Sequence, residues 1–549
     1  MSTSMTGLLR RNLDADPDAT LLIDAGVEAP LTVTRIGFAR RVAGLRAELA
    51  ARGVGPGGCV AVWLPNWSDA LVWQFATVSL GAHVIGVNTR YGVEEVTHVL
   101  RLARPVVVAV AHGFLKLALR DRLLPALAAA AIPPPAVAVI TGPHRAPATA
   151  AELAEYDTGG GAWAPAGADG DPAGLADEPD RLAVAFTTSG STGHPKLAAH
   201  TVAAVAGHAD SSATAAGFDT ESVFACVLPL SGVFSFVPAM ATIAAGGTVL
   251  LEPAFEPATI VRDMARHGAT HLIGADDIVG RLIEAARDNG AGLPRWRRLL
   301  LADFNGRSEE LAEWAERTLG LSAGGVYGSS ELFALTSLWT GTEPLPRRWR
   351  GGGRPVSPAI RVRAADPDTG AVLPPGEAGE LQFLGPNVVD AYLGEPWRRP
   401  TVLTPDGWFR SGDLGTVAVD GSFDYLCRAG DALRLKGFLV EPAEIENRLA
   451  AHPAVELTKV VGLRLPNGET AAVAFVLPRT GMPVAQAELQ AWCATDLARY
   501  KVPRSVHVIS AFPVTSGVNG TKVRGATLRD WAEAFERDPG FLPPSEQPA

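Results

Sequence analysis

Cysteine is scarce in this sequence, and long apolar runs are missing from it. The 549 residues include four cysteines with no CxxC pair among them, so neither a structural zinc site nor a disulfide framework is expected. No uninterrupted apolar stretch reaches the roughly 18 residues of a membrane-spanning helix. The N-terminal stretch also lacks the basic start and apolar core of a secretory signal. We therefore expect a cytoplasmic protein without a membrane span.

An excess of positive charge is absent as well. The chain carries 48 Lys and Arg against 58 Asp and Glu, a formal net charge of −10. Sequence-independent binding of nucleic acid requires a basic surface, so no nucleic-acid partner is expected. A small anionic ligand remains compatible with this charge, because backbone dipoles and a few cations can hold phosphates locally.

Strand-like and helix-like patterns alternate from about residue 40 onward. The first pair is a buried strand at 58–64 and a helix whose apolar face carries Leu71, Phe75 and Val78. Further strand-like runs stand at 82–87, 104–111, 222–228, 247–252, 269–275 and 297–302. Such alternation indicates βαβ units, and hence an α/β fold with largely parallel sheets covered by helices.

Two later regions differ in character. Residues 133–180 are dense in Pro, Gly, Ala and Asp, which predicts a solvent-exposed excursion from the core. After about residue 355, short strand signals separated by Gly and Pro turns indicate a smaller β-rich unit.

The chain beyond residue 430 reads as a separate α/β domain of ordinary size. Leu489, Cys493 and Leu497 share one face of a helix expected around 487–500, so Cys493 is expected to belong to the core of that domain.

The stretch TTSGSTGHPK, residues 187–196, follows an apolar run and holds glycines, hydroxyl side chains and Lys196. A loop of this composition can wrap anionic oxygens with backbone N–H groups and hydroxyls, and its glycines let the backbone approach closely. It is not a P-loop, which requires GxxxxGK followed by Ser or Thr. On its own the stretch is compatible with a phosphate cradle, a surface turn or a low-complexity linker.

Further motifs resolve this choice. VYGSSE (326–331), GWFRSGDLG (407–415), CRAGDALRLKGFLVEPAEIE (427–446), YKVPR (500–504) and NGTKVR (519–524) follow the loop in that order. The series closely resembles the adenylate-forming superfamily, which includes acyl- and aryl-CoA synthetases, luciferases and adenylation domains of peptide synthetases. The resemblance covers about residues 30–530. Its motifs are closest to those of coumarate-CoA-ligase-like and fatty-acyl-CoA-ligase-like enzymes.

The resemblance implies an architecture. The N-terminal domain, residues 1–428, would consist of two βα-layered sheets plus a small β-rich subdomain and would bind ATP and the acid. The C-terminal domain, residues 431–549, would be a mobile small α/β domain that carries a catalytic lysine. The hinge would lie near 429–431.

The resemblance also implies a reaction and its cofactors. ATP and a carboxylic acid would form an acyl-AMP and pyrophosphate, with Mg²⁺, and coenzyme A would then accept the acyl group. An anionic carboxylate must attack the phosphorus of an anionic phosphate group. Charge neutralisation and in-line positioning are therefore the physical requirements.

Residues of the loop match the family's phosphate-binding positions. They are Thr188, Ser189, Gly190, Ser191, Thr192, Gly193 and Lys196. Glu331 matches the Mg²⁺ ligand and would also act in catalysis, while Thr192 would add a hydroxyl ligand to the metal. We call residues 187–196 the phosphate loop from here on.

The nucleotide would be held by residues of the next motifs. Tyr327 and Gly328 would lie at the adenine, and Ser330, which stands where the family usually has threonine, keeps a hydroxyl for the α-phosphate. Asp413 matches the carboxylate that accepts both ribose hydroxyls, and Arg428 matches a second ribose and phosphate contact.

Two lysines match catalytic positions of the family. Lys522 corresponds to the lysine that bridges the carboxylate and the α-phosphate during adenylation. Lys436 corresponds to a second functional lysine, and Gly437 would let the pantetheine arm pass close to the backbone in the thiol-transfer step.

Three positions depart from the family pattern. Gly430 stands where a charged hinge residue is common, Gly232 stands where a histidine or aromatic residue often gates the acid pocket, and the loop 302–310 is unlike the usual sequence. The expected pocket residues are Gly232, Phe234, Phe236, Asn305, Gly306, Gly325 and Phe333.

The favoured reading is an acid–CoA ligase for an aryl, arylacrylic or medium-length acyl carboxylate. The alternative is an adenylating ligase with another acceptor: a carrier protein, an amine, or nitrite activated for N–N bond formation. A non-catalytic nucleotide-binding protein should have lost Lys522, Glu331 or Asp413, and all are present. A peptide-synthetase module is disfavoured, because the gate segment has no aspartate for a substrate ammonium group. The oligomeric state is open, a homodimer included.

Overall fold

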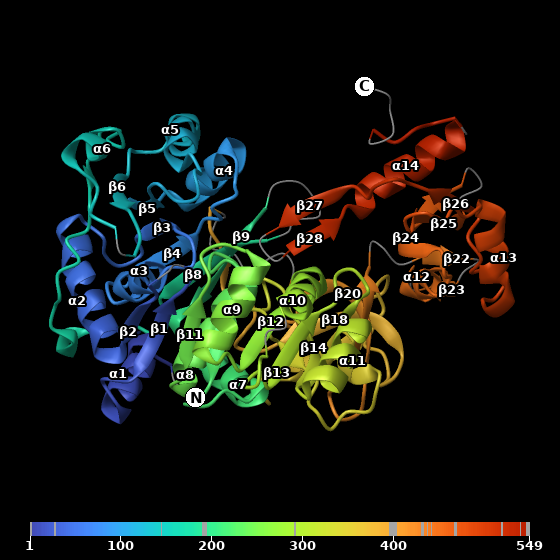
Figure 1. Ribbon diagram of the computed structural model, residues 1–549, viewed down its shortest axis with the longest axis horizontal. Coiled ribbons are helices and arrows are strands. Elements are labelled where there is room, and N and C mark those ends of the chain that lie inside the picture. Colours follow the sequence, from blue (N-terminus) through green and yellow to red (C-terminus); the bar gives the residue numbers. More distant parts are fainter. Residues whose placement is uncertain are drawn as a thin grey trace. The chain divides into compact units, whose positions relative to one another are not determined.

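The computed structural model contains two compact units (Figure 1). Unit 1 comprises residues 1–302, 308–361 and 383–409, and unit 2 comprises 303–307, 362–382 and 410–549. The structure describes residues 3–26, 29–143, 145–188, 195–289, 292–394, 403–429, 433–435, 438–440, 442–465, 469–517, 520–538 and 540–544.

The first sheet of unit 1 contains eight strands among the described residues. In spatial order they are β19 (Ala391–Tyr392), β9 (Leu197–Thr201), β8 (Leu182–Thr187), β4 (His83–Gly86), β3 (Cys59–Trp63), β5 (Val107–Ala111), β6 (Ala136–Ile140) and β7 (Ala162–Trp163). From β8 to β7 all neighbours are parallel, whereas β9 runs antiparallel to β8 and to β19. Strands β3, β4 and β5 are buried throughout, as expected for parallel strands covered on both faces.

The second sheet of unit 1 is also largely parallel. Its order is β16 (Gly352–Pro355), β15 (Ser337–Leu338), β14 (Ser322–Tyr327), β13 (Arg298–Ala302), β12 (His271–Ala275), β10 (Val223–Cys226), β11 (Thr248–Leu251), β1 (Thr20–Asp24) and β2 (Leu31–Thr34). The chain leaves β10 for β11 on one side and later returns to β12 on the other. Ligands of open α/β sheets bind beside the carboxyl ends of the strands at such a switch point.

Helices cover both sheets. Helix α8 (Val233–Ala245) contacts β10, β11 and β12, and α7 (Val202–Ala216) packs on α8. Figure 1 shows α9 (Pro257–His267), α10 (Asp276–Asn289) and α11 (Ser308–Leu319) along strands β11 to β14. Helix α8 begins after Gly232 and ends at Gly246, whose φ of 78° is the left-handed conformation that glycine adopts without strain.

Helix α3 (Ser68–Val78) lies between the two sheets, since it contacts β4 and β8 of the first sheet and β1 of the second. The predicted apolar face of Leu71, Phe75 and Val78 is confirmed as buried. The polar side chains of Ser68, Gln74 and Thr77 are buried as well, and Asp69 is half-buried. Gln74 donates to the Ala183 carbonyl at 2.9 Å, so burial does not leave the amide unpaired. The central position of the helix explains why it has no exposed polar face.

The prediction of an exposed excursion at 133–180 was wrong for residues 136–140, whereas most of the described residues after them are exposed or half-buried. Strand β6 is an interior strand of the first sheet with its last four residues buried, and β7 pairs with it. Further on, Gly170 donates to the Arg40 carbonyl at 2.9 Å and thereby docks on α2 (Arg35–Ala51). Because the segment is dense in Pro, Gly and Ala, the short run Ala-Val-Ala-Val-Ile between turn signals was not predicted to be a strand.

Unit 2 contains the small β-rich part and the C-terminal α/β part. Strands β17 (Arg361–Ala365), β18 (Ala378–Leu384), β20 (Phe409–Val417) and β21 (Phe423–Arg428) are neighbours in that order. The C-terminal part holds β24 (Val455–Arg464), β25 (Thr470–Pro478), β26 (Ser505–Val508), α12 (Pro442–Ala450), α13 (Gln486–Asp496) and α14 (Gly525–Arg537). Cys493 is fully buried in one of its core clusters, which confirms the packing role expected for that thiol.

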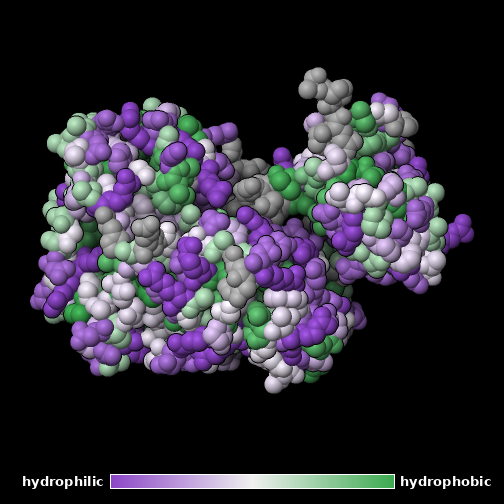
Figure 2. Space-filling view, viewed as in Figure 1, coloured by the Kyte–Doolittle hydropathy of each residue, from purple (hydrophilic) through white to green (hydrophobic). Residues whose placement is uncertain are grey.

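The described residues contain no helix long and apolar enough to cross a bilayer. On the face drawn in Figure 2, hydrophobic residues are mostly scattered among hydrophilic ones, which is ordinary for a protein whose large apolar side chains fill its cores.

Arg35 is a buried charge that joins α2 to the carboxyl-terminal ends of two helices. It is 4% exposed, and its guanidinium donates to the carbonyl of Asn12 in α1 (Met5–Ala15) at 3.1 Å and to the carbonyl of Gly246 after α8 at 2.6 Å. Cations are favoured at helix carboxyl termini, where carbonyls lack intrahelical partners.

We expect Arg35→Met to lower the free energy of unfolding of unit 1 by about 3 kcal/mol, because buried carbonyls would lose a charged donor. The measurement is equilibrium denaturation, with the free energy taken from the transition in which unit 1 unfolds. Arg40→Met, on the exposed face of the same helix, is the control and should change stability by less than about 0.5 kcal/mol. Equal effects of the two substitutions would contradict this role of Arg35.

Candidate functional site

The phosphate loop joins two antiparallel strands. Thr187 at the end of β8 pairs with Leu197 at the start of β9, Thr188 N–H donates to the Lys196 carbonyl at 2.9 Å, and Lys196 N–H donates to the Thr188 hydroxyl at 3.2 Å. The loop therefore does not open a helix, and a phosphate there would rely on backbone N–H groups, hydroxyls and Lys196 rather than on a helix dipole. Ser189, Gly190, Ser191, Thr192 and Gly193 lie outside the described residues.

Both ends of this loop are braced by the segment around α4 (Val93–Ala103). The Tyr91 hydroxyl lies 2.7 Å from the Thr187 hydroxyl, and His98 Nε2 donates to the Pro195 carbonyl at 2.7 Å. Burial raises the pKa of Tyr91, so its hydroxyl stays protonated at neutral pH. These two contacts fix the positions at which the loop leaves and rejoins the sheet.

Lys196 lies beside an aromatic ring. Its Nζ is 4.5 Å from the centroid of the Tyr392 ring on β19, within the range of a cation–π interaction. The lysine predicted to meet phosphates is thus held next to the loop by the neighbouring strand.

The VYGSSE motif begins at the end of β14 and continues into a tight return of the chain, residues 329–335, which we call the 329–335 turn. Tyr327 is buried, and its ring is parallel to that of Phe383, with centroids 5.5 Å apart and 16° between the planes. A Cβ atom at Gly328 would lie 2.7 Å from Cα of Ala334, so only glycine lets the chain fold back this closely. The expected contact of Tyr327 and Gly328 with adenine stays a prediction.

The turn carries Ser330 and Glu331 to the edge of the first sheet. The Ser330 hydroxyl donates to the Thr187 carbonyl at 3.2 Å, and the Glu331 carbonyl accepts from Val389 N–H at 2.7 Å. The structure therefore brings the predicted metal ligand and the predicted α-phosphate contact next to the strand that precedes the phosphate loop.

The predicted pocket residues of unit 1 lie at and on α8, on β14 and in the 329–335 turn. Gly232 is the residue before α8 and is buried, while Phe234 and Phe236 are buried on the helix. Gly325 is buried on β14, where a Cβ atom would lie 1.8 Å from the Arg350 carbonyl oxygen, so a side chain cannot be accommodated there. Phe333 is buried in the 329–335 turn.

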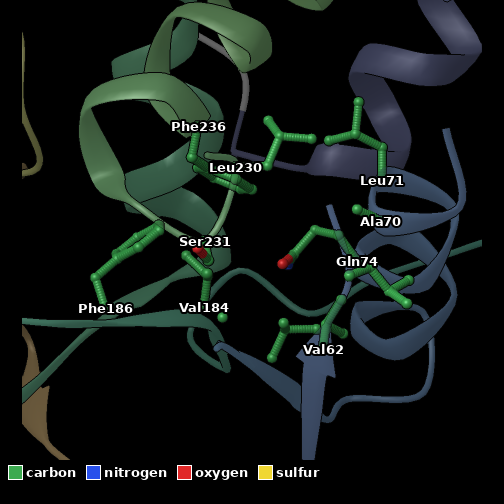
Figure 3. A pocket seen from close by; sticks show the side chains of 12 residues that line it. Val62, Ala70, Leu71, Gln74, Val184, Phe186, Leu230, Ser231 and Phe236 are labelled. Carbon is green, nitrogen blue, oxygen red and sulfur yellow. The ribbon is translucent and has the colours of Figure 1, made fainter. Parts of the chain in front are cut away.

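A small cavity of about 30 Å³ lies beside the Gly232 position (Figure 3). Ser231 and Phe236 line it from the α8 side, Phe186 from β8, and Gln74 from α3. Phe186 contacts Phe236 at 5.4 Å between centroids and Phe333 at 6.1 Å. Phe236 and Phe333 are thereby brought together, whereas Phe234 does not line this cavity.

In unit 2 the structure pairs Asp413 with Arg428. These residues face each other on β20 and β21, Arg428 Nε lies 3.1 Å from Asp413 Oδ1, and Asp413 is 5% exposed. Arg428 also donates to the Ser411 carbonyl at 3.0 Å, which fixes the guanidinium. A buried carboxylate with an arginine partner can accept hydrogen bonds from two hydroxyl groups and still remain charged.

For the other predicted residues of unit 2, the structure gives backbone positions or does not describe them. Asn305 and Gly306 follow β13, and Gly306 has a φ of 79°. The backbone of Lys522 belongs to β28 (Gly520–Val523) and pairs with Thr515 of β27 (Val514–Gly517). Lys436 and Gly437, like Gly430, lie outside the described residues.

The donors present fit Mg²⁺ that arrives with a nucleotide. The described residues contain no group of three or more His, Cys, Asp or Glu side chains that could hold a metal on their own. Mg²⁺ usually takes one or two carboxylates and completes its shell with water and substrate phosphates. Glu331 supplies one carboxylate in unit 1, whereas Thr192, the predicted hydroxyl ligand, lies outside the described residues.

Sequence reasoning missed several residues that shape the site: Tyr91, His98, Phe186, His200, His208, Ser231 and Gln74. The partners of the histidines and of Tyr91 are backbone carbonyls or a hydroxyl group far away in the sequence. No local pattern identifies such contacts.

The two-sheet α/β fold, together with the family that the chain matches, defines an ATP-dependent, AMP-forming ligase. The sequence comparison agrees with this class. The chain belongs to the AMP-binding enzyme family, whose profile matches residues 9–393, and the profile of the AMP-binding enzyme C-terminal domain matches residues 444–517. The predicted superfamily and fold class are confirmed.

Relatives span nearly the whole chain. A feruloyl-CoA synthase of Amycolatopsis sp is 31% identical, with 94% of this chain and 97% of that protein covered. The 4-coumarate–CoA ligase-like 6 protein of Oryza sativa is 27% identical, with 90% and 81% covered. Among solved structures, ATP-bound MatB of Rhodopseudomonas palustris has a TM-score of 0.78 at 25% identity, with 96% and 99% covered. The amide bond synthetase McbA of Marinactinospora thermotolerans has a TM-score of 0.79 at 26% identity, also with 96% and 99% covered.

We expect Tyr91→Phe to raise the KM for ATP by about fivefold with a smaller effect on kcat, because the loop end at Thr187 would lose one brace worth roughly 1 kcal/mol. Initial rates of pyrophosphate release at varied ATP measure this. Tyr156→Phe is the matched control, since that buried hydroxyl contacts His112 at 2.9 Å instead of the loop. An unchanged KM in a folded Tyr91→Phe variant would contradict the bracing role.

Proposed function

We propose that this ligase is an acid–CoA ligase that activates an aryl, arylacrylic or medium-length acyl carboxylate as acyl-AMP and transfers the acyl group to coenzyme A. The observation that carries the proposal is the similarity over nearly the full length to a feruloyl-CoA synthase, whose name describes an arylacrylic thioester product. The rings of Phe186 and Phe236 can pack against an aryl group, but the cavity of about 30 Å³ that they line would have to widen to hold one.

The first half-reaction needs positive charge around the triphosphate. Lys196 and the backbone N–H groups and hydroxyls of the phosphate loop would bind the β- and γ-phosphates. Glu331, with Thr192, would hold the Mg²⁺ ion. When bound, this ion would neutralise phosphate charge and favour attack by the carboxylate.

Residues that match family positions would orient the acyl and adenylyl groups. Tyr327 would lie at the adenine, the Ser330 hydroxyl would turn from the Thr187 carbonyl to donate to the α-phosphate, and Asp413 would accept from both ribose hydroxyls beside Arg428. Lys522 would bridge the carboxylate and the α-phosphate and stabilise the charge that develops between them.

The second half-reaction would use the C-terminal domain, for which we propose residues 431–549, with a hinge near 429–431 and an N-terminal domain of residues 1–428. Gly430 would leave φ and ψ free at the hinge. Lys436 and Gly437 would then complete the thiol site for coenzyme A. A cytoplasmic location is part of the same proposal.

A second candidate function is adenylation with an acceptor other than coenzyme A. The amide bond synthetase supports it, because that protein matches this chain as well in fold and coverage as the other solved structures do. Gly232 and Gly430 also depart from the usual pattern of CoA ligases. An amine, a carrier protein or nitrite would then replace the thiol.

We expect Lys522→Ala to reduce acid-dependent pyrophosphate release by about 10²-fold, because a preorganised charge at the reacting oxygens would be lost. The assay uses ATP, Mg²⁺ and a panel of benzoic, cinnamic and fatty acids plus nitrite. Lys459→Ala, which removes a lysine that lies 3.1 Å from Glu446, is the control and should keep most of the activity. A Lys522→Ala enzyme as fast as the wild type would contradict the assignment.

We expect coenzyme A to convert a single turnover into multiple turnovers with the correct acid, because the thiol removes the tightly held acyl-AMP. Pyrophosphate release and thioester formation should be followed together with and without coenzyme A. Multiple turnovers that require an amine or nitrite instead, with no thioester, would favour the second candidate.

A further inference from the structure

The 329–335 turn is held from outside by two buried histidines. His200 on β9 donates from Nε2 to the Ser330 carbonyl at 2.8 Å, and His208 on α7 donates from Nε2 to the Ala334 carbonyl at 2.8 Å. Both residues are buried, and burial lowers the pKa of each imidazole to about 4, so both rings are neutral at physiological pH.

Phe333, between these two carbonyls in the sequence, is wedged against both rings. Its centroid lies 4.4 Å from that of His200 and 5.4 Å from that of His208. Phe186 and Phe236, which line the cavity of Figure 3, contact the same ring at 6.1 Å and 6.3 Å. The turn is therefore fixed by side-chain packing as well as by hydrogen bonds.

Two further donors hold the carbonyls between Ser330 and Ala334. Val389 N–H donates to the Glu331 carbonyl at 2.7 Å, and Asn387 Nδ2 donates to the Leu332 carbonyl at 2.9 Å. Donors from β9, α7 and the segment before β19 thus determine the backbone on both sides of Glu331.

The turn needs this support, because its backbone is unfavourable. Phe333, Ala334 and Leu335 have φ values of 57°, 43° and 36°, a left-handed conformation that residues with a Cβ atom avoid. Such conformations persist where the surroundings over-determine them, and they cluster at functional sites.

Packing alone does not account for an imidazole at residue 200. Within the described part of the chain, His200 Nδ1 has no hydrogen-bond partner, and burying an unpaired polar atom is unfavourable. An apolar side chain would avoid this penalty. What the imidazole provides in return is the Nε2–H bond to the Ser330 carbonyl, one residue before Glu331.

We propose that His200 and His208 are positioning residues: they clamp the 329–335 turn so that the Ser330 hydroxyl and the Glu331 carboxylate face magnesium–ATP at the phosphate loop. The proposal rests on the proposed adenylation function. Residues that orient a metal ligand from behind determine metal affinity without touching the metal.

The first test replaces the donor while the volume is kept. His200→Leu and His208→Leu should each raise the Kd for ATP, measured by calorimetry in the presence of Mg²⁺, and the Mg²⁺ concentration for half-maximal pyrophosphate release, by roughly tenfold. His200→Gln, whose amide N–H can reach the same carbonyl, should restore both quantities to within about threefold of the wild type.

His271→Leu is the matched control. His271 is also a buried histidine stacked on a phenylalanine, Phe218, with centroids 4.3 Å apart, and burial lowers its pKa to about 4. Its side chain contacts Thr270 at the start of β12 and not the 329–335 turn. It should lower thermal stability about as much as the clamp variants, while leaving the Kd and the Mg²⁺ requirement unchanged.

Three results would overturn the clamp: an unchanged Kd and Mg²⁺ requirement in folded His200→Leu, no rescue by His200→Gln, or an equal shift in His271→Leu. If His200→Leu does not fold, His208→Leu and His200→Asn, which is too short to reach Ser330, provide the same comparison. The calorimetric measurement of ATP binding needs no acid. A wild-type chain that binds magnesium–ATP but activates no acid would therefore contradict the proposed function. The comparison of Kd values between the variants would still test the clamp.

Discussion

The contact between the 329–335 turn and the β8–β9 hairpin is the constraint on which the candidate site depends. The phosphate loop belongs to the first sheet of unit 1, whereas Ser330 and Glu331 follow a strand of the second. The bond of the Ser330 hydroxyl to the Thr187 carbonyl and that of His200 to the Ser330 carbonyl join the two sheets at this point. Together with the bonds from His208, Asn387 and Val389, they hold the proposed phosphate loop and the proposed metal ligand Glu331 in a fixed relation.

The same constraint accounts for the buried polar side chains around the site. Two sheets can approach closely only if the element between them is buried on all sides, and α3 satisfies this with Gln74 and Ser68 paired to the backbone or to Asp24. The neutral histidines and the protonated Tyr91 follow the same rule. In each of them a hydrogen bond offsets the free-energy cost of burying a polar group. Burial also disfavours the ionised form of each side chain.

Much of the fold could be predicted from the sequence because it depends on local patterns. Buried strands such as β3 and β5, and the helix that carries Leu71, Phe75 and Val78, follow directly from hydrophobic periodicity. The ordered motifs also predicted the superfamily, but they did not predict that Asp413 and Arg428 pair with each other on adjacent strands.

Features that depend on distant partners could not be predicted. Strand β6 was hidden by neighbouring prolines and glycines, and its burial follows from its place in the sheet. His200 and His208 stand in a run of small residues with no motif of their own, and their partners are carbonyls more than a hundred positions further along the chain. The left-handed backbone of Phe333 likewise has no local signal, because a large aromatic residue adopts it only under external constraint.

The central claim is that the chain transfers an adenylyl group from ATP to a carboxylate, and oxygen transfer tests this most directly. A carboxylic acid labelled with ¹⁸O in both carboxyl oxygens would be turned over with ATP, Mg²⁺ and acceptor, and the nucleotide product examined by mass spectrometry. The account predicts one ¹⁸O atom in AMP, since the carboxylate oxygen bonded to the α-phosphorus stays with it when the acyl group leaves. Unlabelled AMP, or label found in inorganic phosphate with ADP as the nucleotide, would contradict it.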